Sequence, residues 1–322
     1  MPVLSNSGNH LAPAPEVRFV RISEAQEGQR LDNFLIRLCK GVPKSHIYKA
    51  VRAGQVRVNR GRCSVDYRLK LDDEVRVPPF RLPTPSARQV PGRSFQTVYE
   101  DESLLVINKP AGMAVHGGSG ISHGVIESLR AARPEAAFLE LVHRLDRDTS
   151  GLLMLAKQRK ALVRLHAMMR EGLIRKFYVA LVQGRLKNDR QHLKAPLTKW
   201  LTATGERRVK VDPDGQFAHT IVTCLQRFDA SSLVQAELRT GRTHQIRVHL
   251  ASIGHPIVGD EKYGSDDLNT QWRGGGVKRM MLHARSLSFE HPVTGEQMEI
   301  EAAVPSEFEM IGRVLRIKPD SR

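Results

Sequence analysis

The first eighty residues show a helical spacing of apolar positions, followed by a strand-like alternation. A helix over 30–39 is predicted by the three-to-four-residue spacing of Leu31, Phe34, Leu35 and Leu38. A second helix begins at Pro43 and closes at Gly54. Residues 56–58 then alternate and lead into the turn 59–61. The pattern therefore predicts a small domain with two helices followed by strands.

A proline-rich stretch separates this region from the rest of the chain. Residues 78–92 contain five prolines, which cannot form a helix or donate hydrogen bonds to a sheet. The residues before the first domain are polar and predict a loose tail. We expect a flexible tail over 1–17, a first domain over 18–80, a linker over 81–94 and a second domain over 95–322.

The pattern after residue 95 alternates short apolar segments with two or three helices. Strands are expected over 97–99, 104–107, 152–155, 177–182, 218–228, 233–238, 287–289 and 297–301. Helices are expected over 122–132, 159–170 and 244–253. Many strands with few helices predict an α+β fold with a mainly antiparallel sheet in this domain.

Charge changes this picture by suggesting a partner. The 322 residues include 50 Lys and Arg against 34 Asp and Glu, so the formal net charge is +16. A chain this basic favours a polyanionic partner, and nucleic acid is the first candidate. The excess is concentrated in 44–70, where eight bases accompany one acid.

The basic stretch of the first domain is a candidate RNA-binding surface, formed by Lys44, Lys49, Arg52 and Arg57. On the second helix, His46, Lys49 and Arg52 share one face. Any one of these cations is more simply explained as a solvated charge. The whole cluster, a basic helix face beside a basic hairpin, favours contact with a phosphate backbone.

Several classes of protein are not expected. The three cysteines are odd in number and widely spaced, so they form no disulfide framework and fit a reducing cytoplasm. No apolar run is long enough to span a bilayer, and the N-terminus lacks a secretory signal. Thirteen histidines include no H-E-x-x-H pattern, and His244 and His249 lie five residues apart, so no metal site is predicted.

The glycine-rich residues 117–120 lack a phosphate-loop pattern and are expected to form a flexible loop near the functional site.

The densest polar segment in an apolar setting is 141–151. It contains a histidine, two arginines and two aspartates, which are costly to bury unless they are paired or used. For Asp148 and Ser150 a salt-bridged, capped loop is the favoured interpretation. Asp146 is the exception, for a reason that comes from a longer motif.

Residues 143–151 have the pattern H-R-L-D-x-x-T-S-G, which resembles the signature of the RluA-type pseudouridine synthases. Further stretches resemble other motifs of this family, at 104–112, 175–181, 240–249 and 255–264. Together they cover nearly all of 97–303. Residues 28–80 resemble the S4 RNA-binding domain, through R-L-D-x-F-L, K-S-x-I-Y-K and G-x-V-x-V-N. The S4-like domain narrows the resemblance further, together with the segments 116–120 and 138–151. With these features the chain resembles family members that act on RNA of the large ribosomal subunit.

The resemblance implies an isomerase that breaks the N1–C1′ bond of uridine, turns the uracil and joins C5 to C1′. It implies that Asp146 is the catalytic aspartate, Arg247 its cationic partner, Tyr178 the residue that stacks on the uracil, and Arg144 the residue that enters the RNA where the base was. Without the motifs, a surface arginine, a core tyrosine and a local salt bridge would be the simpler interpretations of Arg247, Tyr178 and Arg144.

The sequence therefore predicts a cytoplasmic, monomeric 23S rRNA pseudouridine synthase that uses no cofactor or metal. Two alternatives stay open. The same chemistry could act on another RNA, such as tRNA or a different rRNA uridine. The chain could instead be a non-catalytic RNA-binding factor of ribosome assembly.

Overall fold

The computed structural model describes residues 16–39, 41–80, 90–118, 122–308 and 310. The chain divides into two compact units, 1–89 and 90–322. The expected tail and linker lie largely outside the described residues, and so does part of the glycine-rich loop 117–120. Within the described part of the chain, every helix is too short or too polar to cross a membrane.

The first unit packs two helices and a three-stranded antiparallel sheet around one apolar core. Its elements are β1 (Arg18–Arg21), α1 (Leu31–Leu38), α2 (Lys44–Arg52), β2 (Arg57–Val58) and β3 (Glu74–Val77). The strands lie in the order β1-β3-β2. Both predicted helices are confirmed, and α2 buries Ile47, Ala50 and Val51 in this core.

A buried aspartate joins the two helices of this unit. Arg30 donates to both carboxylate oxygens of Asp32, at 3.1 and 3.0 Å, and the Tyr48 hydroxyl donates to Asp32 Oδ2 at 2.6 Å. Hydrogen bonds from Arg30, together with those from Tyr48, lower the pKa of Asp32 to about 2 despite its burial. The R-L-D and I-Y-K segments of the sequence thus meet at one charged contact between α1 and α2.

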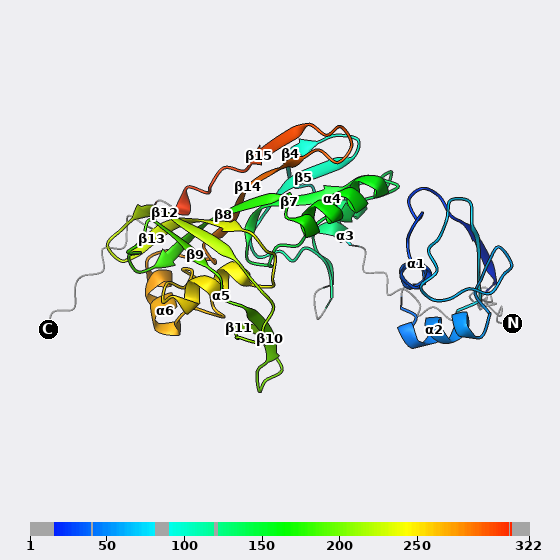
Figure 1. Cartoon of the computed structure of the whole chain (residues 1–322), viewed down its shortest axis with the longest axis horizontal. Coiled ribbons are helices and arrows are strands. Elements are labelled where there is room, and N and C mark those ends of the chain that lie inside the picture. Colours follow the sequence, from blue (N-terminus) through cyan, green and yellow to red (C-terminus); the bar gives the residue numbers. More distant parts are fainter. Residues whose placement is uncertain (1–15, 40, 81–89, 119–121, 309, 311–322) are drawn as a thin grey trace, which may run out of the picture. The chain divides into compact units, whose positions relative to one another are not determined.

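The second unit is built on a ten-stranded sheet, which Figure 1 shows as a long, twisted surface. Its strands are β4 (Gln96–Glu100), β5 (Leu104–Lys109), β6 (Glu140–Leu141), β7 (Ser150–Ala156), β8 (Arg175–Gln183), β9 (Arg190–Leu193), β12 (Thr220–Arg227), β13 (Ser231–Leu238), β14 (Leu282–Glu290) and β15 (Gln297–Glu301). The main path is β4-β5-β7-β14-β8-β13-β12-β9, and β6 pairs with β7 and β15 with β14. Only β7 and β14 pair in parallel among the described strands, so the mainly antiparallel sheet is confirmed.

Four helices accompany this sheet in the described residues, one more than the two or three predicted. They are α3 (Val125–Ala132), α4 (Arg159–Glu171), α5 (Gln245–Ser252) and α6 (Asp266–Gly274). The first begins three residues later than expected, because Gly124 is its cap and the Glu127 carboxylate accepts the Gly124 N–H at 2.8 Å. α6 is the helix that the sequence analysis missed.

A separate hairpin completes the unit. The strands β10 (Leu197–Leu201) and β11 (Arg207–Val211) pair only with each other, and Figure 1 shows them projecting away from the large sheet. Leu197 and Val209 bury against Ala218 and Val248, with Tyr263 beside them. This small apolar cluster fixes the base of the hairpin beside α5.

Candidate functional site

The polar segment 142–149 forms a loop between β6 and β7 whose backbone is fixed by hydrogen bonds. The Val142 N–H donates to the Met154 carbonyl at 3.0 Å, and the Met154 N–H donates to His143 Nε2 at 3.1 Å. Burial, together with the charge of Lys176, lowers the pKa of His143 to about 4. The imidazole is therefore neutral at pH 7, and its Nε2 accepts the backbone hydrogen bond that holds the start of the loop.

A buried lysine anchors the far end of the same loop. Lys109, at the end of β5, is fully buried, and its Nζ donates to the carbonyls of Pro110, Met113 and Arg147 at 2.8, 2.8 and 3.0 Å. Three acceptors match the three N–H bonds of an ammonium group. Burial lowers the pKa of Lys109 to about 8, so the group is still mainly protonated at pH 7. The segment 104–112 thus positions the loop that carries Asp146.

The glycine of the T-S-G triplet is required by close packing of two strands. Gly151 has φ of 108° and pairs with Ala284 where β7 runs parallel to β14. A Cβ at this position would lie 2.2 Å from the Ala284 carbonyl oxygen. Because any side chain would push β14 away from β7, this glycine sets the position at which the loop enters the sheet.

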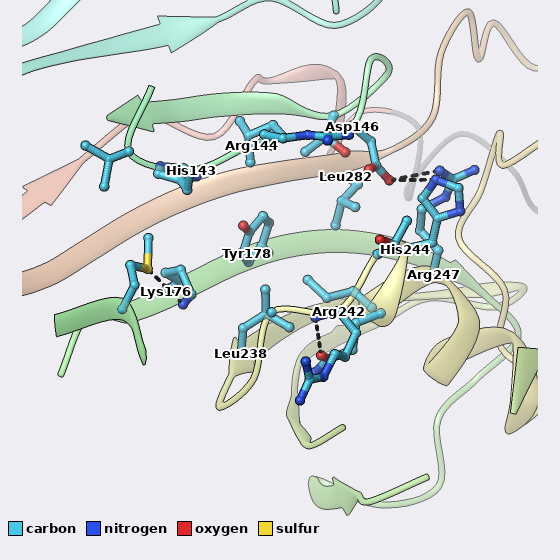
Figure 2. A pocket seen from close by; sticks show the side chains of 18 of the residues that line it. His143, Arg144, Asp146, Lys176, Tyr178, Leu238, Arg242, His244, Arg247 and Leu282 are labelled. Carbon is cyan, nitrogen blue, oxygen red and sulfur yellow. Dashed lines mark hydrogen bonds and ion pairs between the residues drawn. The ribbon is translucent and has the colours of Figure 1, made fainter. Parts of the chain in front are cut away.

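Three charged side chains form a continuous line at the centre of the site. Arg247, on α5, donates from Nη1 to Asp146 Oδ2 at 2.9 Å, which Figure 2 shows as a dashed line. Its Nε and Nη2 donate to the two carboxylate oxygens of Asp260, at 2.7 and 2.8 Å. The Asp146 side chain is 29% exposed, whereas that of Asp260 is fully buried. Burial opposes the charge of Arg247, but Asp260 and then Asp146 outweigh it and raise the pKa of Arg247.

Asp260 is the partner that the sequence analysis did not identify. Its Oδ1 also accepts the backbone N–H groups of Lys262 and Tyr263, at 2.9 and 3.2 Å, while Asn269 Nδ2 donates to its carbonyl. It lies within the segment 255–264 that resembles the family, but no spacing relates it to Arg247. The available signal was its charge next to an apolar P-I-V-G run.

His244 and Tyr263 close the site on the side of α5. His244 caps α5 with a left-handed φ of 53°, and its Nε2 lies 3.8 Å from Asp146 Oδ2. Its Nδ1 lies 2.7 Å from the Tyr263 hydroxyl, which accepts the Val209 N–H of β11 at 3.0 Å. The Arg247 guanidinium lies over the Tyr263 ring at 5.1 Å. Tyr263 therefore links the charged line to the β10–β11 hairpin.

The predicted residues Asp146, Tyr178, Arg247 and Arg144 line one cavity of about 740 Å³. Figure 2 shows Tyr178 on β8 between the Asp146 loop and the strand that carries Leu238. Tyr178 is 7% exposed, and burial, followed by the charge of Asp146, raises its pKa. An aromatic ring and a carboxylate therefore line the same cavity.

Arg144 and Asp148 lie in the same loop but differ in their contacts. Arg144 is exposed, and its side chain makes no hydrogen bond or ion pair with any residue that the structure describes. The local salt bridge considered for Arg144 is therefore not formed. Asp148 pairs with Arg147 at 3.1 Å, as the salt-bridged interpretation predicts. The Ser150 hydroxyl lies 2.9 Å from His283 Nδ1 and accepts from Arg279 Nη1 at 2.9 Å.

The four predicted RNA-binding cations of the first unit are all exposed. Lys49 and Arg52 project from α2, where Lys44 Nζ lies over the Tyr48 ring at 5.2 Å. Arg57 is different, because its Nε and Nη1 donate to the carbonyls of Gly54 and Arg60, both at 3.2 Å. Arg57 therefore also fixes the turn after β2.

Acid is expected to destabilise the protein through His283, a fully buried residue of β14 whose Nδ1 lies 2.9 Å from the Ser150 hydroxyl. Burial, with the charge of Arg279, lowers its pKa from 6.5 to about 4. The unfolded chain therefore binds this proton more readily, and the stability conferred by neutral His283 is present above pH ~6.5 and lost as the pH falls towards ~4. From pH 7.5 to 5 this loss is about 2 kcal/mol. Urea unfolding should show that the free energy of unfolding falls between pH 7.5 and pH 5, and that this fall is about 2 kcal/mol smaller in His283→Gln. An equal fall in the variant and the wild type would contradict the role of His283.

Comparison with known proteins places these features in a family. A model described as RNA pseudouridylate synthase matches residues 103–252, and an S4 domain model matches residues 29–75. A protein of Yersinia pestis called ribosomal large subunit pseudouridine synthase C is 50% identical over 300 residues, which cover 91% of this chain and 94% of that protein. A protein of the same name from Escherichia coli is 48% identical over 89% of this chain and 93% of its own length.

Solved structures agree with this result. Human RNA Pseudouridylate Synthase Domain Containing 1 is similar with a TM-score of 0.58 and 26% identity, covering 69% of this chain and 89% of that one. Human RNA Pseudouridylate Synthase Domain Containing 4 is similar with a TM-score of 0.56 and 25% identity, covering 67% of this chain and 91% of that one. The chain therefore belongs to the RNA pseudouridylate synthase family and carries an S4 domain ahead of the synthase domain.

Proposed function

We propose that this protein isomerises specific uridines of 23S rRNA to pseudouridine, with Asp146 as its catalytic residue. The observation that carries the proposal is the cavity in which a partly exposed Asp146 is held by a buried Arg247 and faces the ring of Tyr178. The choice of 23S rRNA rests on the names of the relatives that match nearly the whole chain. We also propose that the protein acts as a monomer in the cytoplasm.

The reaction is balanced within the uridine itself. The N1–C1′ bond breaks, the uracil turns, the C5–C1′ bond forms, and the hydrogen of C5 is released as a proton while N1 takes one up. Breaking a glycosidic bond develops positive charge on the sugar, which a nearby carboxylate stabilises. Asp146 acts on the ribose in this scheme, either by attacking C1′ or by removing the C2′ proton. Arg247 holds the carboxylate in place for either role.

Tyr178 and Arg144 have complementary tasks in this proposal. Stacking on an aromatic ring is worth roughly 1–3 kcal/mol per base, and Tyr178 offers its ring inside the cavity. The target base must first leave its stack, which costs a few kcal/mol. Arg144 is exposed and has no partner among the described residues, so its planar guanidinium is available to take the place of the base.

Tritium release from unmodified 23S rRNA labelled at C5 of uridine tests the proposal. Pseudouridine formation expels the hydrogen at C5, so each turnover should release tritium from the RNA. Release, with pseudouridines mapped to a few positions, is the expected result. Tritium release only from tRNA or another rRNA would show that the enzyme acts on that RNA instead of 23S rRNA. Tight RNA binding without release from any of these RNAs would instead indicate a binding factor.

Removing two charges from α2 is expected to weaken RNA binding and reduce its dependence on salt. Each phosphate contact contributes about 0.7–0.9 to the slope of log K against log salt, so Lys49→Gln with Arg52→Gln should lower the magnitude of that slope by about 1.4–1.8. Filter binding at several salt concentrations measures it. Lys160→Gln with Lys187→Gln, which removes the same charge from the second unit, is the control. An unchanged slope in the α2 variant would remove this helix from the RNA-binding surface.

A further inference from the structure

A second, smaller cavity adjoins the one that contains Asp146. It has a volume of about 290 Å³, near the lower end of the roughly 300–1,000 Å³ of ligand pockets. One side is the hairpin, through Thr198, Lys199 and Val209, and Gln216 also lines it. The other side is the segment 241–243, which lines both cavities. Whatever occupies the second cavity is therefore next to the occupant of the first.

Hydrogen bonds fix the wall between the two cavities. The buried Gln245 accepts hydrogen bonds at Oε1 from the Thr240 hydroxyl and the Arg242 N–H, at 2.7 and 3.0 Å. Arg242 Nε donates to the Phe217 carbonyl at 3.1 Å, which leaves its Nη1 and Nη2 atoms without a partner in the described structure. The hairpin side is held as well, because the Val209 N–H donates to Tyr263. Both walls are thus tied to residues of the site.

The charges around this cavity are distributed unevenly. Of the described residues that line it, none is acidic, and two are cations, Lys199 and Arg242. Two other cations of the hairpin are neutralised, since Arg208 pairs with Glu206 at 2.9 Å and Lys210 with Asp212 at 3.4 Å. Lys199 and Arg242 have no carboxylate partner among the described residues. The two cations that face the cavity are therefore available to an anionic ligand.

We propose that this second cavity binds the nucleotide next to the target uridine in the RNA chain. The inference rests on the proposed function, because the first cavity must hold that uridine. An RNA strand supplies what the cavity lacks: a phosphate for Lys199 and Arg242, and a base whose edge offers donors and acceptors. Thr198, Gln216 and Thr243 carry hydroxyl and amide groups that can hydrogen-bond to such an edge. The cavity thus positions the strand and discriminates among neighbouring bases.

Two variants separate the phosphate contact from the base contact. Lys199→Gln removes a cation from the cavity wall, and Gln216→Ala removes an amide. Arg207→Gln is the matched control, because Arg207 is exposed on the same hairpin, lacks an ion-pair partner in the described structure and does not line the cavity. The substrates are short RNAs around a uridine mapped with the wild-type protein, either intact or with an abasic nucleotide on one side of that uridine. Binding and single-turnover conversion are measured separately.

An abasic nucleotide on one side of the uridine should weaken wild-type binding by about 5-fold or more, but should cost the Gln216→Ala variant less than 2-fold. With the abasic nucleotide on the other side of the uridine, the wild type and Gln216→Ala should lose binding affinity by the same factor. Lys199→Gln should weaken binding several-fold more than Arg207→Gln, with conversion at saturation within 2-fold of wild type. The subsite would be overturned by two results together. The abasic nucleotide would weaken binding equally in the wild type and in Gln216→Ala on either side of the uridine, and Lys199→Gln would bind RNA as well as Arg207→Gln. Absence of conversion by the wild-type protein would refute the proposed function. The comparison of Lys199→Gln with Arg207→Gln needs only binding to unmodified 23S rRNA, so it would still decide whether the cavity wall contacts RNA.

Discussion

Asp146→Asn is expected to abolish pseudouridine formation while leaving RNA binding within a few-fold of the wild-type value. The asparagine has the same shape, and its oxygen can still accept the hydrogen bond from Arg247 Nη1 that holds the residue at 2.9 Å. It has no charge to stabilise the sugar and no basic lone pair for proton transfer. Positioned acid–base groups alone contribute roughly 10²–10⁴-fold, so tritium release should fall by at least that factor.

Asp148→Asn is the matched control for this experiment. Asp148 lies two residues away in the same loop, and its carboxylate pairs with the exposed Arg147 instead of a buried partner. Its loss should change the rate less than about 2-fold, because exposed ion pairs contribute little. Filter binding on the same RNA separates a defect in chemistry from a defect in affinity. Conversion by Asp146→Asn at more than a few per cent of the wild-type rate would remove Asp146 from the catalytic role.

The sequence motifs predict which residues share the site better than they predict how the site is held. Asp146, Tyr178 and Arg247 come from three separate motifs, and the fold brings all three to one cavity. Lys109 lies in a motif that resembles the family, yet its three carbonyl acceptors depend on where a loop 38 residues later passes over it. Hydrogen bonds to backbone carbonyls leave no trace in residue types, so only the structure reveals this contact.

The elements missed from the sequence are those with weak periodicity. In β10 the residues from Lys199 to Leu201 are all exposed, so the strand lacks the alternation that indicates a half-buried strand. In α6 only Asn269 and Trp272 are buried, which gives no apolar stripe. Both elements lie beside the site, where their residues contact Asp260 and the second cavity. The local pattern fails there because each element buries only one or two side chains, and the partners of those side chains come from other parts of the chain.

Arg247→Met is expected to destabilise the second unit by roughly 3–5 kcal/mol, because it leaves the carboxylate of Asp260 buried without a cation. Asp146 is partly exposed and can be solvated, so Asp260 accounts for most of the loss. Asp260→Asn in the same chain should therefore restore much of the stability. The asparagine Oδ1 can still accept the N–H groups of Lys262 and Tyr263, and no buried charge remains.

Stability and activity should separate in this pair of variants. Urea unfolding should rank the wild type first, the double variant second and Arg247→Met last, since removing both members of a buried ion pair costs less than removing one. Tritium release should be lost in both variants, because neither holds Asp146 in place. If the double variant is less stable than Arg247→Met, the charge of Asp260 is not the source of the loss. If it regains turnover along with stability, Arg247 acts only through folding, and the carboxylate of Asp146 needs no cation to work.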